Sequence, residues 1–378
     1  MQKRPMSNTF GPNRRAMLKG MGAVGLAGMA GLAPSRARAA TAMNYMCWEG
    51  YDKDTIIQPF EAANDVEVSI DLITDSPGGF AKLAAGAWQD FDVVSSDSPW
   101  IQRMGPAEIA EFIDPAEFAD VYEGFYEQFR APFAPLEFDG KVTGLPTRWG
   151  WVGPTVNTEY DSLEKWSSYD PCFDPAYKDK ICVLDWGDWP IMPMALHAGI
   201  NPYEELDDAA LNEIRLVLRA LFKNTRAVVA DLSVAQKGLM DGSFRTLIGG
   251  GTYCTSALRK DGMKHIQSIV PEPKNGLNQG IIWMEATGIV KDPSDAAKAK
   301  ALLRHLVSPE VAVELAWTEA TCNLVPSQKA EALFTDEQKD VLQMDYMWEA
   351  WDKSQFHNVA PNIDQMLEIW QQELAAAN

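Results

Sequence analysis

Several tryptophans of this chain stand beside acidic residues, in segments that read as strand ends or turns. The face of an aromatic ring attracts an ammonium group or its adjoining methylenes, at about 0.5–2 kcal/mol per contact, and a carboxylate adds charge-assisted hydrogen bonds. Each pair alone is more often part of a core or a surface, but the recurrence predicts a cage for a small cationic solute. The members are Trp48 with Glu49 and Tyr51, Trp100 near Asp97, Trp186 and Trp189 around Asp185 and Asp188, and Trp283 with Glu285.

The acids by themselves leave other chemistry open. Asp185 and Asp188, or Glu285, could act as the acid and base of a secreted hydrolase, although no Gly-x-Ser-x-Gly signature is present. The turn "IGGGTY" ends at Tyr253 and lacks the lysine of a phosphate-binding loop. We interpret it as a close-packed turn that brings Tyr253 to the wall of the ligand cleft.

The cysteines and histidines show no metal-binding pattern. The four histidines are widely spaced and no Cys-x-x-Cys motif occurs, so we expect no zinc or haem site and no cofactor. Cys172 and Cys182 are close enough in sequence for a disulfide in an oxidising compartment. Because Cys182 lies in the apolar run "ICVLDW", two buried thiols are an equal alternative.

The first 39 residues have the features of an export signal. Arg14 and Arg15 open "RRAMLK", a glycine- and alanine-rich apolar stretch follows, and "ARAA" offers cleavage after Ala39. The arginine pair indicates the twin-arginine route and a periplasmic protein. The apolar stretch is too short and too rich in glycine to span a membrane.

The charge of the remaining chain is strongly negative. The first 39 residues hold seven basic and no acidic residues, so their removal lowers the formal net charge from −20 to −27. This balance disfavours nucleic acid and anionic lipid as partners and is compatible with attraction of cations. We expect a monomer with enough residues for two domains.

Strand and helix patterns alternate through the first half of the chain. The runs "MNYMCW", "VEVSIDLI" and "FDVVSS" read as strands, and stretches with helical spacing lie between them. This order predicts an α/β fold with a largely parallel sheet. Ligands bind beyond the carboxyl ends of such strands, so "WEGYD" and "SSDSPW" are expected to be neighbours in space.

A crossing into a second lobe is predicted at Pro146–Gly150, in a stretch rich in glycine, proline and tryptophan. The last helical pattern, "IDQMLEIWQQELAAA", is expected to dock on the second lobe. The expected organisation is a signal in 1–39, a first lobe in 40–147 plus 283–327, and a second lobe in 148–282 plus 328–378.

With these blocks in view, the chain resembles the periplasmic spermidine/putrescine-binding family of ABC-transporter solute-binding proteins. The resemblance covers nearly the whole mature chain at low identity, and it depends on the order and spacing of the blocks. It implies two α/β lobes of the type II-like periplasmic binding protein fold, with hinge crossovers and a ligand cleft between the lobes. The blocks are "CWEGYD", "FDVVSSDSPWIQRM", "GLPTRWGWVGPTVNTEYD", "CVLDWGDW" and "GIIWMEATGIV".

The resemblance also implies site residues. Gly249 stands where the family often has a tryptophan, and Glu285 replaces an aspartate, so the pocket differs from the family's pattern. His357 or Gln355 is nearest to the family's C-terminal glutamine. Ligand-facing positions carried over by block are Trp48 and Tyr51, Ser98 with Pro99 and Trp100, Asp185 and Asp188, and Trp283 with Glu285.

The expected function is therefore capture of a polyamine, such as putrescine or spermidine, and its delivery to a membrane permease, without catalysis. The alternatives are another cationic or zwitterionic nitrogen compound, namely a quaternary amine, an amino acid derivative or an opine-like conjugate, and the secreted hydrolase. A ferric-ion carrier of similar fold is disfavoured, because no tyrosine pair stands out with a histidine.

Overall fold

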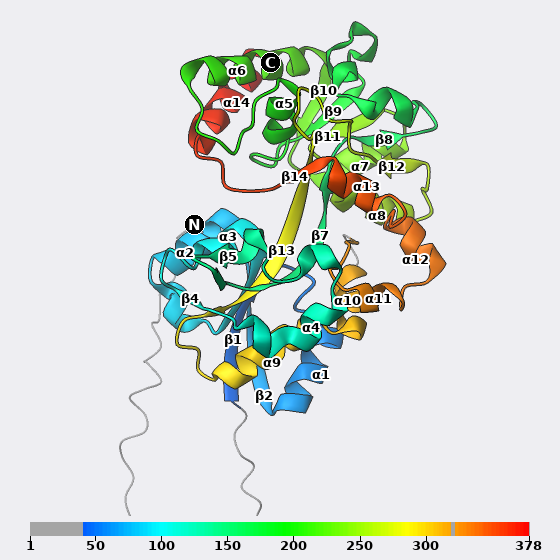
Figure 1. Cartoon of the computed structure of the whole chain (residues 1–378). Coiled ribbons are helices and arrows are strands. Elements are labelled where there is room, and N and C mark those ends of the chain that lie inside the picture. Colours follow the sequence, from blue (N-terminus) through cyan, green and yellow to red (C-terminus); the bar gives the residue numbers. More distant parts are fainter. Residues whose placement is uncertain (1–40, 319–321, 378) are drawn as a thin grey trace, which may run out of the picture. The chain divides into compact units, whose positions relative to one another are not determined.

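Two β-sheets with helices packed around them organise the chain (Figure 1). The computed structural model describes residues 41–318 and 322–377. The proposed export signal with its cleavage site lies outside the described residues. Among the described residues, no helix combines the length and hydropathy needed to cross a membrane.

The first sheet has the strand order β14-β13-β3-β1-β2, with β4 and β7 also paired to β13. As predicted, its first three strands in sequence are parallel, whereas β13 runs antiparallel to β3. Its strands are β1 (Thr41–Cys47), β2 (Val66–Leu72), β3 (Val93–Asp97), β4 (Ala110–Glu111), β7 (Leu145–Val152), β13 (Gly280–Val290) and β14 (Ser354–Phe356). A small hairpin pairs β5 (Glu137–Phe138) with β6 (Lys141–Val142).

The alternation in "VEVSIDLI" predicts a half-buried strand with Val66, Val68, Ile70 and Leu72 on one face, but this face is buried only at one end. Val66 is buried, but the side chain of Leu72 is 47% exposed. The reason is that β2 is the last strand of its sheet, so its far end has no neighbour to cover it.

The second sheet has the order β10-β9-β11-β8-β12. β9 is parallel to both its neighbours, and β8 is antiparallel to its own. Its strands are β8 (Thr155–Asn157), β9 (Ile181–Leu184), β10 (Thr225–Val229), β11 (Thr246–Ile248) and β12 (Ile266–Ser268).

The helices predicted between the first three strands and at the C-terminus are present as α1, α2 and α14. α14 packs on α6, where the rings of Trp370 and Phe222 lie 4.9 Å apart, so the predicted docking of this helix is confirmed. The helices are α1 (Asp54–Asn64), α2 (Ser76–Ala84), α3 (Ser98–Arg103), α4 (Ala119–Gly124), α5 (Ile191–His197), α6 (Asp208–Asn224), α7 (Leu232–Met240), α8 (Thr252–Lys260), α9 (Ala296–Leu306), α10 (Pro309–Ala316), α11 (Gln328–Glu331), α12 (Asp336–Val341), α13 (Met347–Asp352) and α14 (Ile363–Ala377).

Strands β7 and β13 link the two sheets. They pair antiparallel along almost their whole length, and every residue of both is buried. β7 continues into β8 of the second sheet through Gly153 and Pro154. Successive side chains of β13 point to opposite faces of the strand. Ile282 packs in the hydrophobic core around the first sheet, and Trp283 packs in the core around the second. The lobe boundaries that we propose thus fall inside two paired strands.

Cys172 and Cys182 are both buried free thiols. The sequence left open either a disulfide or two buried thiols, and the structure contains the two buried thiols. Burial also raises the pKa of Cys182 to about 12, so this thiol stays protonated at neutral pH.

Gly251, at the start of α8, is required by its surroundings. Its φ is +117°, and an added Cβ would lie 2.0 Å from the carbonyl oxygen of Trp151. Gly262 has a φ of +91° but open space around it. A non-glycine residue in such a conformation carries about 1–3 kcal/mol of strain, and overpacking adds about 1–3 kcal/mol. We therefore expect Gly251→Ala to lower the free energy of unfolding by about 1–3 kcal/mol more than Gly262→Ala does. Urea denaturation of both variants measures the difference, and equal losses would contradict the packing argument.

Candidate ligand-binding site

Four aromatic side chains from three elements converge around the turn that follows β9. Trp186 and Trp189 lie in this turn, Tyr253 lies in α8 and Trp283 in β13. Ring centroids are 5.6 Å apart for Trp186 and Tyr253, 6.0 Å for Tyr253 and Trp283, and 6.2 Å for Trp189 and Trp283. The predicted grouping of Tyr253 with Trp283 and the tryptophans of "LDWGDW" is therefore present.

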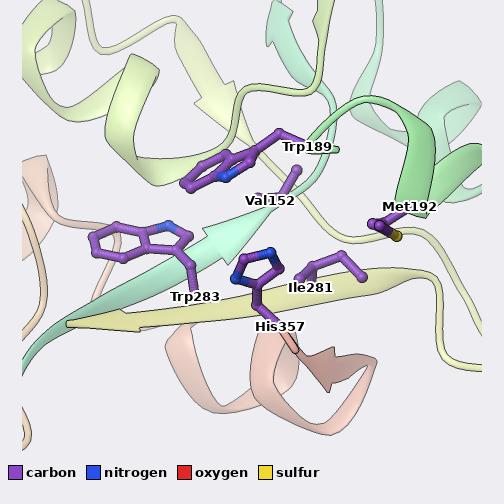
Figure 2. A pocket seen from close by; sticks show the side chains of 6 residues that line it. All are labelled: Val152, Trp189, Met192, Ile281, Trp283 and His357. Atoms are coloured by element: carbon purple, nitrogen blue, oxygen red, sulfur yellow. The ribbon is translucent and has the colours of Figure 1, made fainter. Parts of the chain in front are cut away.

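A small pocket lies against this cluster. Its empty volume is about 190 Å³, and Figure 2 shows the rings of Trp189, Trp283 and His357 turned toward it. The space is too narrow to hold a water molecule, so the protein's own side chains fill it. The lining residues are Val152, Trp189, Met192, Ile281, Trp283 and His357.

The turn after β9 aims Asp188 and Asp185 in different directions. Gly187 has a φ of +61°, which favours glycine and reverses the chain between the two acids. Asp188 accepts a hydrogen bond from Nε2 of His357 at 2.9 Å. Asp185 instead accepts one from Nε1 of Trp370 in α14 at 3.0 Å. Of the two predicted acids, only Asp188 is thus bonded to a residue that lines the pocket.

His357 is held in place at the end of β14. Its backbone N–H donates to the carbonyl of Ile282 at 2.8 Å, and its ring centroid lies 6.4 Å from that of Trp189. Burial by itself would lower the pKa of His357, but the Asp188 carboxylate, with a further contribution from Asp97, raises it above the ordinary value. The imidazole is therefore stabilised as a cation beside Asp188.

Asp97, the last residue of β3, is a functional candidate that the sequence analysis named only as a neighbour of Trp100. Burial raises its pKa to about 6, and the charges of Glu285 and Asp188 act in the same direction, whereas the His357 charge opposes them. Asp97 also sits opposite Glu285 in the strand register. Its position at the carboxyl end of a parallel strand was a signal that could have identified it.

The structure places Glu285 in an internal ion pair. Its carboxylate accepts from Nε of Arg148 at 2.8 Å and from Nη2 at 2.9 Å, and the Tyr51 hydroxyl donates to it at 2.7 Å. The Arg148 guanidinium lies over the Tyr51 ring at 4.6 Å, and all three residues are buried. Sequence reasoning did not single out Arg148, whose partner is 137 residues away.

One donor of this buried group is left over. Among the described residues, Nη1 of Arg148 has no hydrogen-bond partner, and neither has Nε1 of Trp48 or Nε1 of Trp283. Buried polar groups are normally paired. These three donors therefore lack, within the described part of the chain, the acceptors that buried donors normally have.

The remaining predicted residues lie outside the aromatic cluster. Trp100 packs on Phe80 with ring centroids 5.4 Å apart and under the Arg103 guanidinium at 5.2 Å. Ser98 is buried at the start of α3, and Trp48 packs at the edge of the first core. No group of three or more potential metal ligands occurs among the residues that the structure describes.

The raised pKa of Asp97 predicts a stability effect. A raised pKa means that the charged carboxylate is less favourable in the folded than in the unfolded protein above about pH 6. We therefore expect Asp97→Asn to raise the free energy of unfolding at pH 7.5 by about 1–2 kcal/mol, a part of the full linkage value because solvent still reaches the group.

The difference between the two proteins should shrink as the pH falls through about 6, because Asp97 becomes protonated in the folded state. It should vanish only well below pH 3.8, where the unfolded state is protonated as well. Urea denaturation of both proteins at pH 7.5 and pH 4.0 measures this. A variant that is destabilised at pH 7.5 would show that the Asp97 charge is compensated.

Comparison with known proteins agrees with this architecture. Residues 55–345 match the family described as bacterial extracellular solute-binding protein. The spermidine/putrescine-binding periplasmic protein of Salmonella typhimurium is 21% identical over 293 residues, which cover 76% of this chain and 79% of that protein.

Two solved structures have the same fold. The spermidine/putrescine ABC transporter substrate-binding protein from Streptococcus pneumoniae superposes with a TM-score of 0.69 at 15% identity, covering 89% of this chain and 100% of that one. The binding protein MotA from A. tumefaciens B6, in complex with glucopine, has a TM-score of 0.58 at 14% identity, with 89% and 98% covered. The expected two-lobe periplasmic binding protein fold is confirmed, and the chain belongs to the family of bacterial extracellular solute-binding proteins.

Proposed function

We propose that this protein captures a di- or polyamine, such as putrescine or spermidine, in the periplasm and delivers it to the permease of an ABC transporter. The observation that carries the proposal is Asp188, which lies between Trp186 and Trp189 in the turn after β9 and is bonded to His357. His357 lines the pocket together with Trp189 and Trp283. An ammonium group bound there would have a carboxylate partner and aromatic faces around its methylenes.

Asp97 would supply the second negative charge of the site. It comes from the first sheet, whereas Asp188 comes from the second. A diamine that contacts both acids would connect the two sheets and favour a closed form by hinge motion. Glu285 would act through Arg148 and Tyr51, as a positioning residue, rather than on the amine itself.

The comparisons are consistent with this ligand class, because relatives of this chain are spermidine/putrescine-binding proteins. The proposal includes export through the twin-arginine route, action as a monomer, and no catalysis. The hydrolase alternative requires Asp185 and Asp188 to act together as acid and base. Asp185 is instead hydrogen-bonded to Trp370, and Asp188 to His357.

A second candidate is a zwitterionic nitrogen compound, namely an amino acid derivative or an opine-like conjugate. Nη1 of Arg148, which has no acceptor among the described residues, favours it, because a guanidinium N–H is a strong donor to a carboxylate. The similarity to a glucopine-bound structure points in the same direction. In this case the ammonium end would still contact Asp188.

Titration calorimetry with putrescine, spermidine, choline and glucopine tests the proposal. Binding of putrescine or spermidine at micromolar concentration, about −8 kcal/mol, is expected. Binding of glucopine alone would select the second candidate, and binding of none of the four would contradict both.

A further inference from the structure

His357 occupies the place that a ligand ammonium would take. Its Nε2 donates to Oδ2 of Asp188 at 2.9 Å, which is the contact expected of an amine. The side chains are 11% and 21% exposed, respectively, so there is little water around the pair. The imidazole also faces Trp189 and lines the same pocket as Trp283.

The volume of the pocket supports the same conclusion. The pocket is too narrow to hold a water molecule, and His357 is one of the side chains that line it (Figure 2). Oδ2 of Asp188 is already bonded to His357, and a ligand ammonium can therefore take this position only if His357 moves.

Two cations beside one carboxylate repel each other. We propose that the amine displaces the protonated His357 from Asp188, so that binding releases the imidazolium proton to solvent and the affinity rises with pH. This inference rests on the proposed function, which supplies the class of ligand. It makes His357 a built-in competitor that is removed when the ligand binds.

The charged groups that face His357 set the direction of the effect. Asp188, from the turn after β9, and Asp97, from β3, both favour the imidazolium. Glu285 acts on Asp97 and is itself paired with Arg148. Tyr203 lies near Asp188, and its pKa is raised well above the ordinary value by burial and by the Asp188 charge, so it stays neutral. A bound ammonium would cancel the charge that holds the proton on His357, and the proton would leave.

The number of protons released can be measured by titrating putrescine at pH 7.0 in phosphate and in Tris, whose ionisation enthalpies differ. Putrescine stays charged there, since alkyl ammonium groups have a pKa near 10. Asp97 contributes little at this pH, because its pKa is about 6. We expect the wild type to release up to one proton per ligand, and its Kd to fall by up to tenfold per pH unit while His357 titrates.

Two variants test whether the proton released on binding comes from His357. His357→Gln should still bind putrescine but release no proton, with a Kd that is nearly constant from pH 6.5 to 8.5. His265→Gln is the matched control, because His265 is a partly exposed histidine 3.9 Å from Glu159, and it should behave like the wild type. Chemical shifts of the His357 ring in the ligand-free protein, with and without Asp188→Asn, should show a lower pKa in the variant.

The possible outcomes distinguish the role of His357 from the amine-binding function itself. Putrescine binding without proton release, or release that persists in His357→Gln, would overturn the role of His357 and leave the amine-binding function intact. Absence of binding by all four compounds named above would contradict the proposed function, and the displacement of His357 with it.

Discussion

Replacing Glu285 by glutamine should lower the free energy of unfolding by about 3–5 kcal/mol, the range for removing one partner of a buried ion pair. The side chains of Arg148 and Glu285 are only 3% and 6% exposed. The substitution leaves the guanidinium charge buried without a counter-charge and weakens the hydrogen bond from Tyr51. Urea or thermal denaturation at pH 7.5 measures the loss.

Two controls make the result specific. The double variant Arg148→Met/Glu285→Leu removes both charges, so it should be more stable than the sum of the single changes implies. Asp71→Asn breaks the exposed pair between Asp71 and Lys82, whose side chains are 44% and 45% exposed, and should cost less than about 1 kcal/mol. A loss at Glu285 as small as that at Asp71 would mean that water reaches the buried pair.

The second large effect concerns ligand binding. Asp188→Asn should weaken putrescine binding by about 30-fold or more, because truncating one member of a buried charge pair costs about 2–5 kcal/mol. Calorimetry at pH 8.0, where competition from His357 is reduced, gives the cleanest measurement.

Asp185→Asn is the matched control for this change. Asp185 lies three residues away on the same turn, but its carboxylate contacts Trp370 of α14. We expect the control to bind putrescine like the wild type and to lose some stability. An equal loss of affinity in both variants, or none in Asp188→Asn, would remove Asp188 from the binding site.

The elements of this fold were predictable because their signals are local. The runs that became β1, β2 and β3 show strand patterns within seven residues or fewer, and the spacing of apolar residues in α6 and α14 is helical. The alternation of strands and helices then required parallel pairing. The exposed end of β2 was missed, since only the position of a strand within its sheet decides which of its residues are covered.

The residue types of the site could be predicted from the sequence, but the contacts between their side chains could not. The sequence by itself determined an α/β chain with aromatic and acidic residues at strand ends, and its order of blocks indicated the family. Only the tertiary structure decided that Asp188 contacts His357 across 169 residues of sequence, that Asp185 contacts α14, and that Glu285 is neutralised by Arg148. The physical reason is that periodicity reports which face of an element is buried, whereas the partner of a charge depends on which distant elements pack together.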